Sequence, residues 1–531
     1  MKSILGADNV LHRASDILHD ESRFRGGVPS AVYYPSSIDD IREIVSRAHR
    51  EQWSGLVPVG AQTGITGAAV PLEGEGVISL AEMNKIRRVH ASPGDSASML
   101  CEAGISLAEI ERFLNDPSAW QYPVEGAGQL GVGEWFYPPD PTEDTAQLGG
   151  TVATNASGAR SFRYGPTRKY VRSATVVMAD GDILRLRRGE HPIDEAGVIE
   201  VETDSGRQLR TEPLRYRTPP LKNAAGYYFR QDMDALDLFI GSEGTLGIFA
   251  ELEVSLVRRP KLVSGLSFLP DRPRAFAFAS FLRSQGGVTA IEYFDTTALE
   301  LLRRHADRST LRVPDLPSDS GAAVYWEYDE GCGSLEERLE TWEEALDASG
   351  SSLDTTWSGF DQCERRRLRV FRHAIPELVN LIVAGRASRH PSIRKIGTDA
   401  VVPHEAFEES LSGWIRLIEQ HGIEYVIFGH LGDYHLHCNL LPATPDEMDK
   451  AAEVYRRIMN DVIGRGGSVS GEHGIGKLKR DYLAAMVGPG PLAEMAAVKS
   501  VFDPEWILAG GNLFTGPGGQ SKTSPLPDGA A

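Results

Sequence analysis

Two short segments carry residue types that suit metal binding and acid–base chemistry. Residues 429–437 read GHLGDYHLH and residues 470–477 read SGEHGIGK, so the candidate groups are His430, His435, His437, Glu472 and His473. Imidazole and carboxylate together suit Zn²⁺, with Mn²⁺ or Fe²⁺ as alternatives in a more oxygen-rich shell. A single histidine is usually structural, but two glycine-flanked segments of this kind favour one shared metal site.

The spacing within each segment constrains the side chains only in part. The Gly-Asp pair at 432–433 suits a turn, so strand alternation does not decide which imidazoles converge. His435 and His437 are two residues apart and should share one face of a strand. Glu472 and His473 are adjacent and should point to opposite sides of an extended segment, so that one can bind metal while the other faces a substrate.

Glycine-rich loops indicate a ligand with phosphate groups. Residues 58–67 read PVGAQTGITG, and the backbone amides of such a loop can close around a phosphate. Further clusters lie at 126–133, 147–165 and 241–247. One such loop is often an ordinary turn, but four within one domain favour an organic cofactor. The sequence has neither a GxGxxG that opens a helix after a strand nor a GxxxxGK[ST] motif, so it supports neither a Rossmann site nor a P-loop.

The pattern of elements predicts an α+β protein of more than one domain, because 531 residues exceed what one core organises. Up to residue 260, helices and strands alternate around the glycine loops; one helix follows Ser37, and a hairpin turns at Asp180-Gly181. Residues 261–300 and 323–375 have longer helical patterns. We expect a helical extension at 1–25, followed by a cofactor domain at 26–260. A substrate (cap) domain should cover 261–460, with a strand at 424–428 and a helix at 446–464. A C-terminal segment at 461–515 should return to the cofactor domain and complete the active site, and a disordered tail should cover 516–531.

Five motifs resemble, in the family's order, the FAD-binding PCMH-type domain of the vanillyl-alcohol-oxidase superfamily, and within it the branch of D-lactate, glycolate and D-2-hydroxyglutarate dehydrogenases. They are residues 58–64, 138–141, 149–158, 163–165 and 241–247. The resemblance covers about residues 25–515 and implies an FAD-binding domain followed by an FAD-linked oxidase C-terminal domain. Residues 59–70 contain no histidine or cysteine, so noncovalent FAD is expected. The FAD-binding positions that it implies are Pro58, Val59, Gly60, Ala61, Gln62, Thr63, Gly64, Thr66, Gly67, Pro139, Asp140, Gly149, Gly150, Asn155, Ser157, Gly158, Tyr164, Gly165, Glu243, Gly244, Ile248 and Asn512.

The same resemblance implies roles for the residues of the two histidine segments. The metal falls to His430, His437 and Glu472, and the catalytic base to His473. His435 is an additional histidine that we place on the substrate side, with its role open.

A basic run at 365–372 offers a cation for the substrate. Most of its arginines suit a solvated helix face, but a carboxylate substrate needs a planar, bidentate partner. The resemblance implies that this partner is Arg372, with Lys395 as a second candidate whose spacing departs from the family's pattern.

These features predict an FAD-dependent dehydrogenase that oxidises a D-2-hydroxy acid to the 2-oxo acid. The metal lowers the pKa of the substrate hydroxyl, His473 takes its proton, and hydride passes to the flavin. The electron acceptor is open among an electron-transfer flavoprotein, a cytochrome and a quinone. The alternative on the same fold is a non-redox transferase that resembles alkyl-glycerone-phosphate synthase.

The composition argues against some classes of binding partner and favours one cellular compartment. The net charge of −19 and pI near 5.3 argue against a nucleic-acid partner and against docking on an anionic membrane. No apolar run reaches the length of a spanning helix, and Met1–Arg25 lacks the apolar core of a signal peptide. Four cysteines without CxxC spacing suit reduced thiols in the cytoplasm. A homodimer is compatible with these data.

Overall fold

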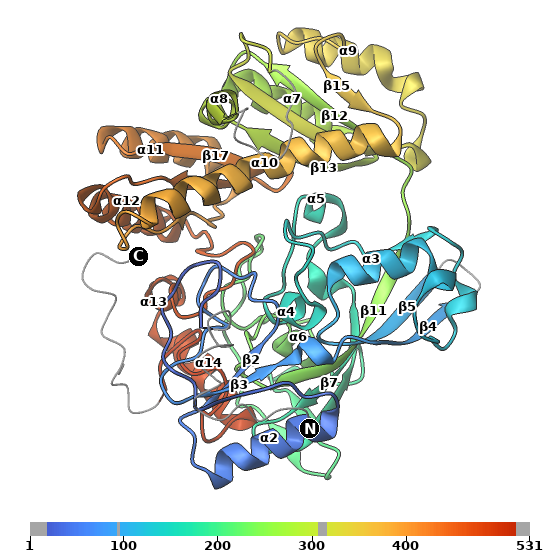
Figure 1. Ribbon diagram of the computed structural model, residues 1–531, viewed down its shortest axis with the longest axis vertical. Coiled ribbons are helices and arrows are strands. Elements are labelled where there is room, and N and C mark those ends of the chain that lie inside the picture. Colours follow the sequence, from blue (N-terminus) through green and yellow to red (C-terminus); the bar gives the residue numbers. More distant parts are fainter. Residues whose placement is uncertain (1–17, 93–95, 306–315, 517–531) are drawn as a thin grey trace. The chain divides into compact units, whose positions relative to one another are not determined.

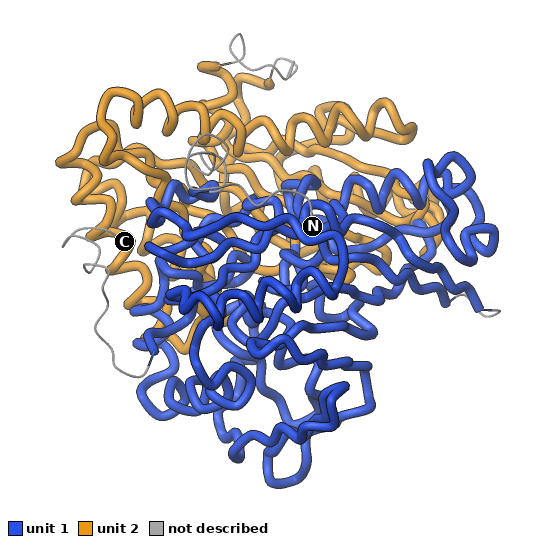
Figure 2. Tube along the Cα trace, turned by 60° about the horizontal axis from the view of Figure 1, so that its bottom comes forward, with its two compact units in different colours: residues 1–157, 166–259, 469–524 blue, residues 158–165, 260–468, 525–531 orange. Residues whose placement is uncertain are grey.

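The computed structural model describes residues 18–92, 96–305 and 316–516, which divide into two compact units (Figures 1 and 2). Within the described chain, unit 1 comprises residues 18–157, 166–259 and 469–516, and unit 2 comprises residues 158–165 and 260–468. The chain therefore enters unit 2 twice and returns to unit 1 at residue 469.

Unit 1 begins with a small parallel sheet in the order β1-β3-β2. Helix α2 starts after Ser37, whose hydroxyl accepts a hydrogen bond from the Asp40 backbone N–H, as the sequence predicts. Val57 and Val77 belong to the apolar cluster that holds this sheet. The bounds are β1 Ala31–Tyr33, α2 Ile38–Arg50, β2 Leu56–Val59 and β3 Gly76–Ser79.

A second, larger sheet of unit 1 has the strand order β4-β5-β11-β7-β8, with β6 paired to β11. The predicted hairpin is confirmed as β7–β8, which turns at Gly181 with a φ of +83° that favours glycine. The bounds are β4 Ile86–Ser92, β5 Ser96–Glu102, β6 Trp135–Phe136, β7 Val171–Val177, β8 Ile183–Arg187 and β11 Ile248–Arg258.

The remaining elements of unit 1 are short helices, one small hairpin and the two helices after residue 479. The bounds are α3 Leu107–Asn115, α4 Leu148–Ala153, β9 Glu200–Glu202, β10 Gln208–Arg210, α6 Ala235–Phe239, α13 Arg480–Val487 and α14 Pro489–Phe502.

Unit 2 is built on a seven-stranded antiparallel sheet in the order β15-β12-β14-β13-β17-β18-β16. Side chains of α8 and α10, including Leu302 and Phe371, pack with sheet residues such as Phe294 in its main core. The predicted strand and helix at 424–428 and 446–464 are confirmed as β17 and α12. The bounds are α5 Ser161–Tyr164, β12 Leu262–Leu269, α7 Arg272–Ser284, β13 Val288–Phe294, α8 Thr296–His305, β14 Ala322–Asp329, α9 Leu339–Ala348, β15 Trp357–Gly359, α10 Gln362–Ala387, β16 Ile396–Gly397, α11 Phe407–Gln420, β17 Tyr425–His430, β18 His435–Leu440 and α12 Pro445–Gly464.

The helical interpretation of residues 261–300 and 323–375 is wrong in part, because these stretches contain three central strands of the sheet. Every residue of β13 is buried, and β12 and β14 are buried over nearly their whole length. Strands buried on both faces lose the alternation of polar and apolar residues by which a strand is recognised.

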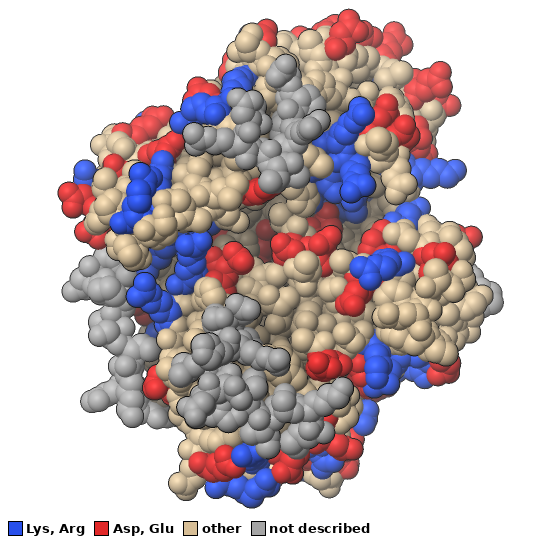
Figure 3. All heavy atoms as spheres, viewed as in Figure 1, with Lys and Arg blue, Asp and Glu red and all other residues tan. Residues whose placement is uncertain are grey.

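The expected helical extension at 1–25 and disordered tail at 516–531 fall largely outside the described residues. Residues 18–25 form a turn and no helix, while the first 17 residues and the tail after residue 516 lie outside the described part of the chain. Among the described helices, none is long and apolar enough to cross a bilayer. On the face that Figure 3 shows, Lys and Arg alternate with Asp and Glu among the described residues without a continuous basic surface.

Candidate active site

Unit 1 contains a cavity of about 600 Å³, its open mouth included, where several glycine loops meet. The predicted cofactor residues Pro58, Val59, Gly60, Gly149, Gly150, Glu243 and Gly244 line it. Of its other lining residues, Gln147, Ala153, Thr154 and Gly247 lie within the predicted glycine-rich segments without having been named singly, whereas the sequence interpretation missed Ala68, Ala69, Leu80, Ala103 and Phe249. The missed residues are small or apolar and carry no motif, so only the fold identifies them.

Two glycines of this cavity, Gly149 and Gly244, are required by space. A Cβ on Gly149 would lie 2.8 Å from the Ala103 Cβ, and one on Gly244, where φ is +76°, would lie 2.7 Å from the Pro58 ring. A Cβ on Gly150 would meet nothing within 4 Å, so its backbone is open to a ligand. The buried Gln147 Oε1 has no hydrogen-bond partner among the described residues. A cradle of bare backbone with one unsatisfied acceptor fits FAD, which offers N–H donors and phosphates.

The C-terminal segment is bonded to the wall of this cavity through Glu243. The buried Glu243 carboxylate accepts hydrogen bonds from the backbone N–H groups of Ile475 and Gly476, both at 2.6 Å. Burial raises the pKa of Glu243 to about 7, against the effect of these two donors and of Lys479 and Lys477. The segment that starts at Glu472 and His473 is thus fixed beside the cavity by the carboxyl oxygens of one side chain.

Lys477 and Asn512 tie the first glycine loop to the same segment. The Lys477 ammonium donates to Gly67 O, Ala68 O and Asn512 Oδ1 at 2.9–3.3 Å, and the Asn512 amide donates to Ala68 O and Glu243 O. Burial lowers the pKa of Lys477 to about 8, opposed by Glu75, Asp20 and Glu243. Asn512 and Gly67, predicted as FAD contacts, serve here to hold the loop.

Glu472 is a buried carboxylate with two partners in unit 1. The Ser157 hydroxyl donates to it at 2.7 Å, and Lys222 Nζ lies 2.6 Å from Glu472 Oε1. Lys222, which the sequence interpretation missed, forms an ion pair with this carboxylate. His473 is partly buried, and its carbonyl accepts a long hydrogen bond from Thr66 Oγ1 at 3.5 Å.

In unit 2 the antiparallel pair β17–β18 brings three imidazoles together. His430 stands opposite His435 in the register, and the His430 and His437 ring centroids are 5.6 Å apart. His430 Nδ1 lies 2.7 Å from Glu292 Oε1, and His437 Nδ1 lies 2.9 Å from Thr398 O. Because carboxylate and carbonyl oxygens accept, both Nδ1 atoms carry the proton in the neutral ring and both Nε2 atoms keep the lone pair that a metal binds. The donor chemistry fits a divalent ion.

Gly429 makes this arrangement sterically possible. Its φ is +139°, and a Cβ there would lie 3.0 Å from His437 Cδ2 and 3.1 Å from His435 O. The glycine before the first histidine is therefore a packing requirement of the cluster. His430 and His437 lie in unit 2 while Glu472 lies in unit 1, so their joint binding of one ion stays a prediction.

Arg372 lies on α10 in a buried charge network of unit 2. Burial would raise the pKa of Glu327, but Arg160, at 2.7 Å, and the charge of Arg372 lower it to about 2. Glu327 also accepts a hydrogen bond from the Tyr325 hydroxyl at 2.6 Å. Two guanidinium groups around one carboxylate leave a net positive charge, which suits a carboxylate ligand.

Lys395, the other candidate cation, makes an exposed hydrogen bond, whereas Arg372 belongs to a buried charge network. Its ammonium donates to Asn380 Oδ1 of α10 at 3.3 Å in an exposed bond. This position supplies no support for a role in substrate binding.

The other predicted cofactor positions divide between the units. Gly158, Tyr164 and Gly165 belong to unit 2, so their contact with a ligand of the unit 1 cavity stays a prediction. Asn155 supports the backbone, since its Oδ1 accepts from the Arg168 N–H at 3.0 Å. The positions outside the cavity lining within unit 1 are Ala61, Gln62, Thr63, Gly64, Thr66, Gly67, Pro139, Asp140, Asn155, Ser157, Ile248 and Asn512.

Comparison with known proteins agrees with this site. Residues 29–187 match the FAD binding domain family and residues 261–513 match the family of FAD linked oxidases, C-terminal domain. The chain is 30% identical to a D-2-hydroxyglutarate dehydrogenase of Stutzerimonas stutzeri (strain A1501), over 92% of this chain and 91% of that protein. It is 28% identical to a D-lactate dehydrogenase of Anaerostipes hadrus, over 96% and 94%.

The solved structures that it resembles include an alkyldihydroxyacetonephosphate synthase, with a TM-score of 0.56 and 14% identity over 91% of this chain and 76% of that one. At that identity the likeness concerns the fold alone. Fold and cavity define an FAD-binding oxidoreductase of the FAD-linked oxidase type. The chain belongs to the family of FAD-linked D-2-hydroxy-acid dehydrogenases that contains the two relatives named above.

The flavin should be released by acid. The cavity's first loop carries no histidine or cysteine, so noncovalent binding of the cofactor is expected. The purified protein should be yellow, and trichloroacetic acid precipitation should leave the flavin absorbance in the supernatant. Flavin that stays with the pellet would show a covalent link.

Glu243→Gln should remove part of the pH dependence of stability. The pKa of Glu243 rises on folding from its ordinary value of 4.5 to about 7, so the folded state binds the proton more tightly. This contribution to stability is present below about pH 4.5 and is lost as the pH rises through about 7. Glutamine does not titrate, so across this window wild type should lose on the order of 3 kcal/mol relative to the variant.

Thermal or denaturant unfolding at both ends of the window measures this difference, with FAD content recorded at each pH. Glu251→Gln, on β11 of the same unit, is the matched control. Parallel pH profiles of wild type and Glu243→Gln would refute the assignment.

Proposed function

We propose that this protein oxidises a D-2-hydroxy acid of the lactate or 2-hydroxyglutarate type to the 2-oxo acid, with noncovalent FAD and a divalent metal. The observation that carries the proposal is the pair of hydrogen bonds from Ile475 and Gly476 to Glu243. They fix His473, two residues before Ile475, in a segment attached to the wall of the cavity that fits FAD. A base beside a flavin is the arrangement that oxidation of an alcohol carbon requires.

The two bound groups supply complementary chemistry. FAD, when bound, accepts the hydrogen of the substrate's C2 as a hydride. A divalent ion, Zn²⁺ in the first place, supplies positive charge that lowers the pKa of the substrate hydroxyl. His430, His437 and Glu472 are its proposed ligands, and Ser157 and Lys222 orient the Glu472 carboxylate.

The side chains of this protein bind the substrate and move its proton. Arg372 binds the substrate carboxylate through its guanidinium, which lies close enough to Glu327 to lower the pKa of that carboxyl together with Arg160. His473 takes the hydroxyl proton on its imidazole while hydride leaves C2. The substrate thus loses a hydride from C2 and a proton from its hydroxyl, and the 2-oxo acid remains.

We also propose a cellular compartment and a class of electron acceptor for this protein. The four cysteines are unpaired thiols, which supports a reducing compartment such as the cytoplasm. The electron acceptor is proposed to be an electron-transfer flavoprotein, a cytochrome or a quinone. The fold likeness to the synthase gives no support for a transferase activity, because it concerns the backbone only.

Anaerobic flavin reduction tests the proposal. Titration with D-lactate and with D-2-hydroxyglutarate should bleach the flavin absorbance near its visible maximum, whereas the L-enantiomers serve as controls. A dye acceptor then gives the turnover of each acid. If no D-2-hydroxy acid reduces the flavin of the metal-replete protein, the proposed function is wrong.

Arg372→Lys should lower kcat/KM while leaving FAD content unchanged, because a point charge does not reproduce a bidentate contact. Loss of such a buried pair costs on the order of 2–5 kcal/mol. Arg369→Lys, at an exposed position of the same helix, is the matched control. Equal kcat/KM values for the Arg372 variant and wild type would place the carboxylate elsewhere.

His473→Ala should lose about 10²–10⁴-fold in the rate of flavin reduction and retain FAD, because it removes the proposed base. Added imidazole should restore part of the rate, measured by stopped-flow under anaerobic conditions. His404→Ala, whose side chain is 65% exposed, is the control. A normal reduction rate in the His473 variant would assign the proton to another group.

A further inference from the structure

Beside the predicted metal ligands, unit 2 brings a second set of ligand atoms together: Asp399, His435 and His437. We propose that these three residues form an inner metal-binding site, which holds a Zn²⁺-type ion without a ligand from unit 1. This site concerns His435, the histidine for which the sequence interpretation left the role open. It is stated for the ion alone and does not depend on which substrate the protein oxidises.

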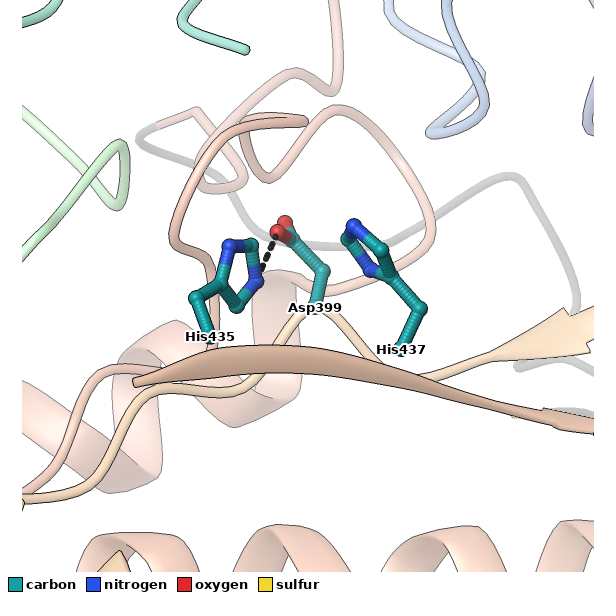
Figure 4. A group of neighbouring side chains, drawn as sticks. All are labelled: Asp399, His435 and His437. Atoms are coloured by element: carbon teal, nitrogen blue, oxygen red, sulfur yellow. Dashed lines mark ion pairs between the residues drawn. The ribbon is translucent and has the colours of Figure 1, made fainter. Parts of the chain in front are cut away.

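The register of two strand pairs positions the three side chains. His435 and His437 are two residues apart on β18 and share one face. Gly397 of β16 pairs with Asn439 of β18, and the Thr398 N–H donates to Cys438 O at 3.0 Å. Asp399, the next residue, therefore reaches the same face, and Figure 4 shows its carboxylate between the two imidazoles.

The distances suit one ion. Asp399 and His435 are both fully buried, and Asp399 Oδ1 lies 3.2 Å from His435 Nε2. The His435 and His437 ring centroids are 4.7 Å apart, and one ligand atom from each of the three residues lies within 4.8 Å of the others. With metal–nitrogen bonds of about 2.0–2.1 Å, two imidazoles on one ion have centroids roughly 4.5–6 Å apart.

The chemistry of the donors suits Zn²⁺ or Co²⁺. Two imidazoles and one carboxylate form a three-ligand set of the kind that catalytic zinc sites use, and it leaves a position open. Thr398 O orients His437 through Nδ1, so that Nε2 is the nitrogen that keeps a lone pair. Imidazole-rich sets bind Zn²⁺ and Co²⁺ more tightly than Mg²⁺ or Mn²⁺.

His437 belongs to both ligand sets, which makes them alternatives. One Nε2 lone pair binds one ion, so an ion in the inner site and an ion held by His430 and His437 exclude each other. His435 lies within reach of either arrangement, since its centroid is 5.8 Å from that of His430. The structural alternative is a buried Asp–His pair that binds no metal, and such pairs do occur in protein cores.

Cobalt binding to the full-length, FAD-containing protein decides between these alternatives. The protein is stripped of metal with a chelator and titrated with CoCl₂, with the visible cobalt absorption and equilibrium dialysis as readouts. The variants are Glu472→Gln, which removes the candidate ligand of unit 1, and the same variant with either His435→Asn or Asp399→Asn added. His404→Asn in the Glu472→Gln background is the matched control.

The inner site predicts that Glu472→Gln still binds one Co²⁺ per chain. His435→Asn and Asp399→Asn should each then weaken binding by at least about tenfold, while His404→Asn should not. The proposal is overturned if Glu472→Gln binds no Co²⁺, or if both inner substitutions leave the affinity unchanged. Because Glu472→Gln leaves the core of unit 2 intact, a lack of Co²⁺ binding by this variant overturns the proposal even if an inner variant fails to fold. Flavin reduction by 2-hydroxy acids is measured separately, so failure of the proposed function and failure of the inner site are distinguishable.

Discussion

Unit 1 depends on one buried carboxylate that receives two backbone N–H groups. Glu243 and its donors Ile475 and Gly476 are more than 230 residues apart in the chain, yet they are joined at 2.6 Å. In a water-excluded interior such a network is strong when every member is satisfied and costly when one is missing. The cavity loops around Gly67 and Ala68 join the network through Lys477 and Asn512, so the cofactor site and the proposed base are positioned together.

In unit 2, the positions of the three imidazoles depend on strand register. The pairing of β17 with β18 places His430 opposite His435, and a slip of one residue would turn His435 and His437 to the other face. Gly429 admits the His437 ring, and Thr398 on the neighbouring segment sets its tautomer. The arrangement of the three imidazoles in this unit therefore follows from backbone geometry as much as from the presence of histidines.

Family membership and local structure explain different parts of the function. The relatives support a 2-hydroxy acid as substrate and FAD as oxidant, whereas a likeness of folds alone extends to a synthase as well. Features particular to this chain are found only in its own contacts, such as the ion pairs of Lys222 with Glu472 and of Asp399 with His435. These contacts set the positions of the side chains that are proposed to bind a metal.

The sequence by itself determined the class of protein through the resemblance of its motifs to a known family, because glycine loops and histidine segments are local patterns whose residue types are required by backbone space and by ligand chemistry. It also determined elements with local signals, such as the helix after Ser37 and the hairpin at Gly181. Tertiary structure alone decided which residues line the cavity, since Ala103 and Phe249 carry no motif and act only through where their strands lie. It also decided that residues 262–269, 288–294 and 322–329 are strands, because burial on both faces removes their alternation. The partners of His430, His437 and Glu472 likewise come from strands and loops distant in sequence, and no local spacing encodes such long-range contacts.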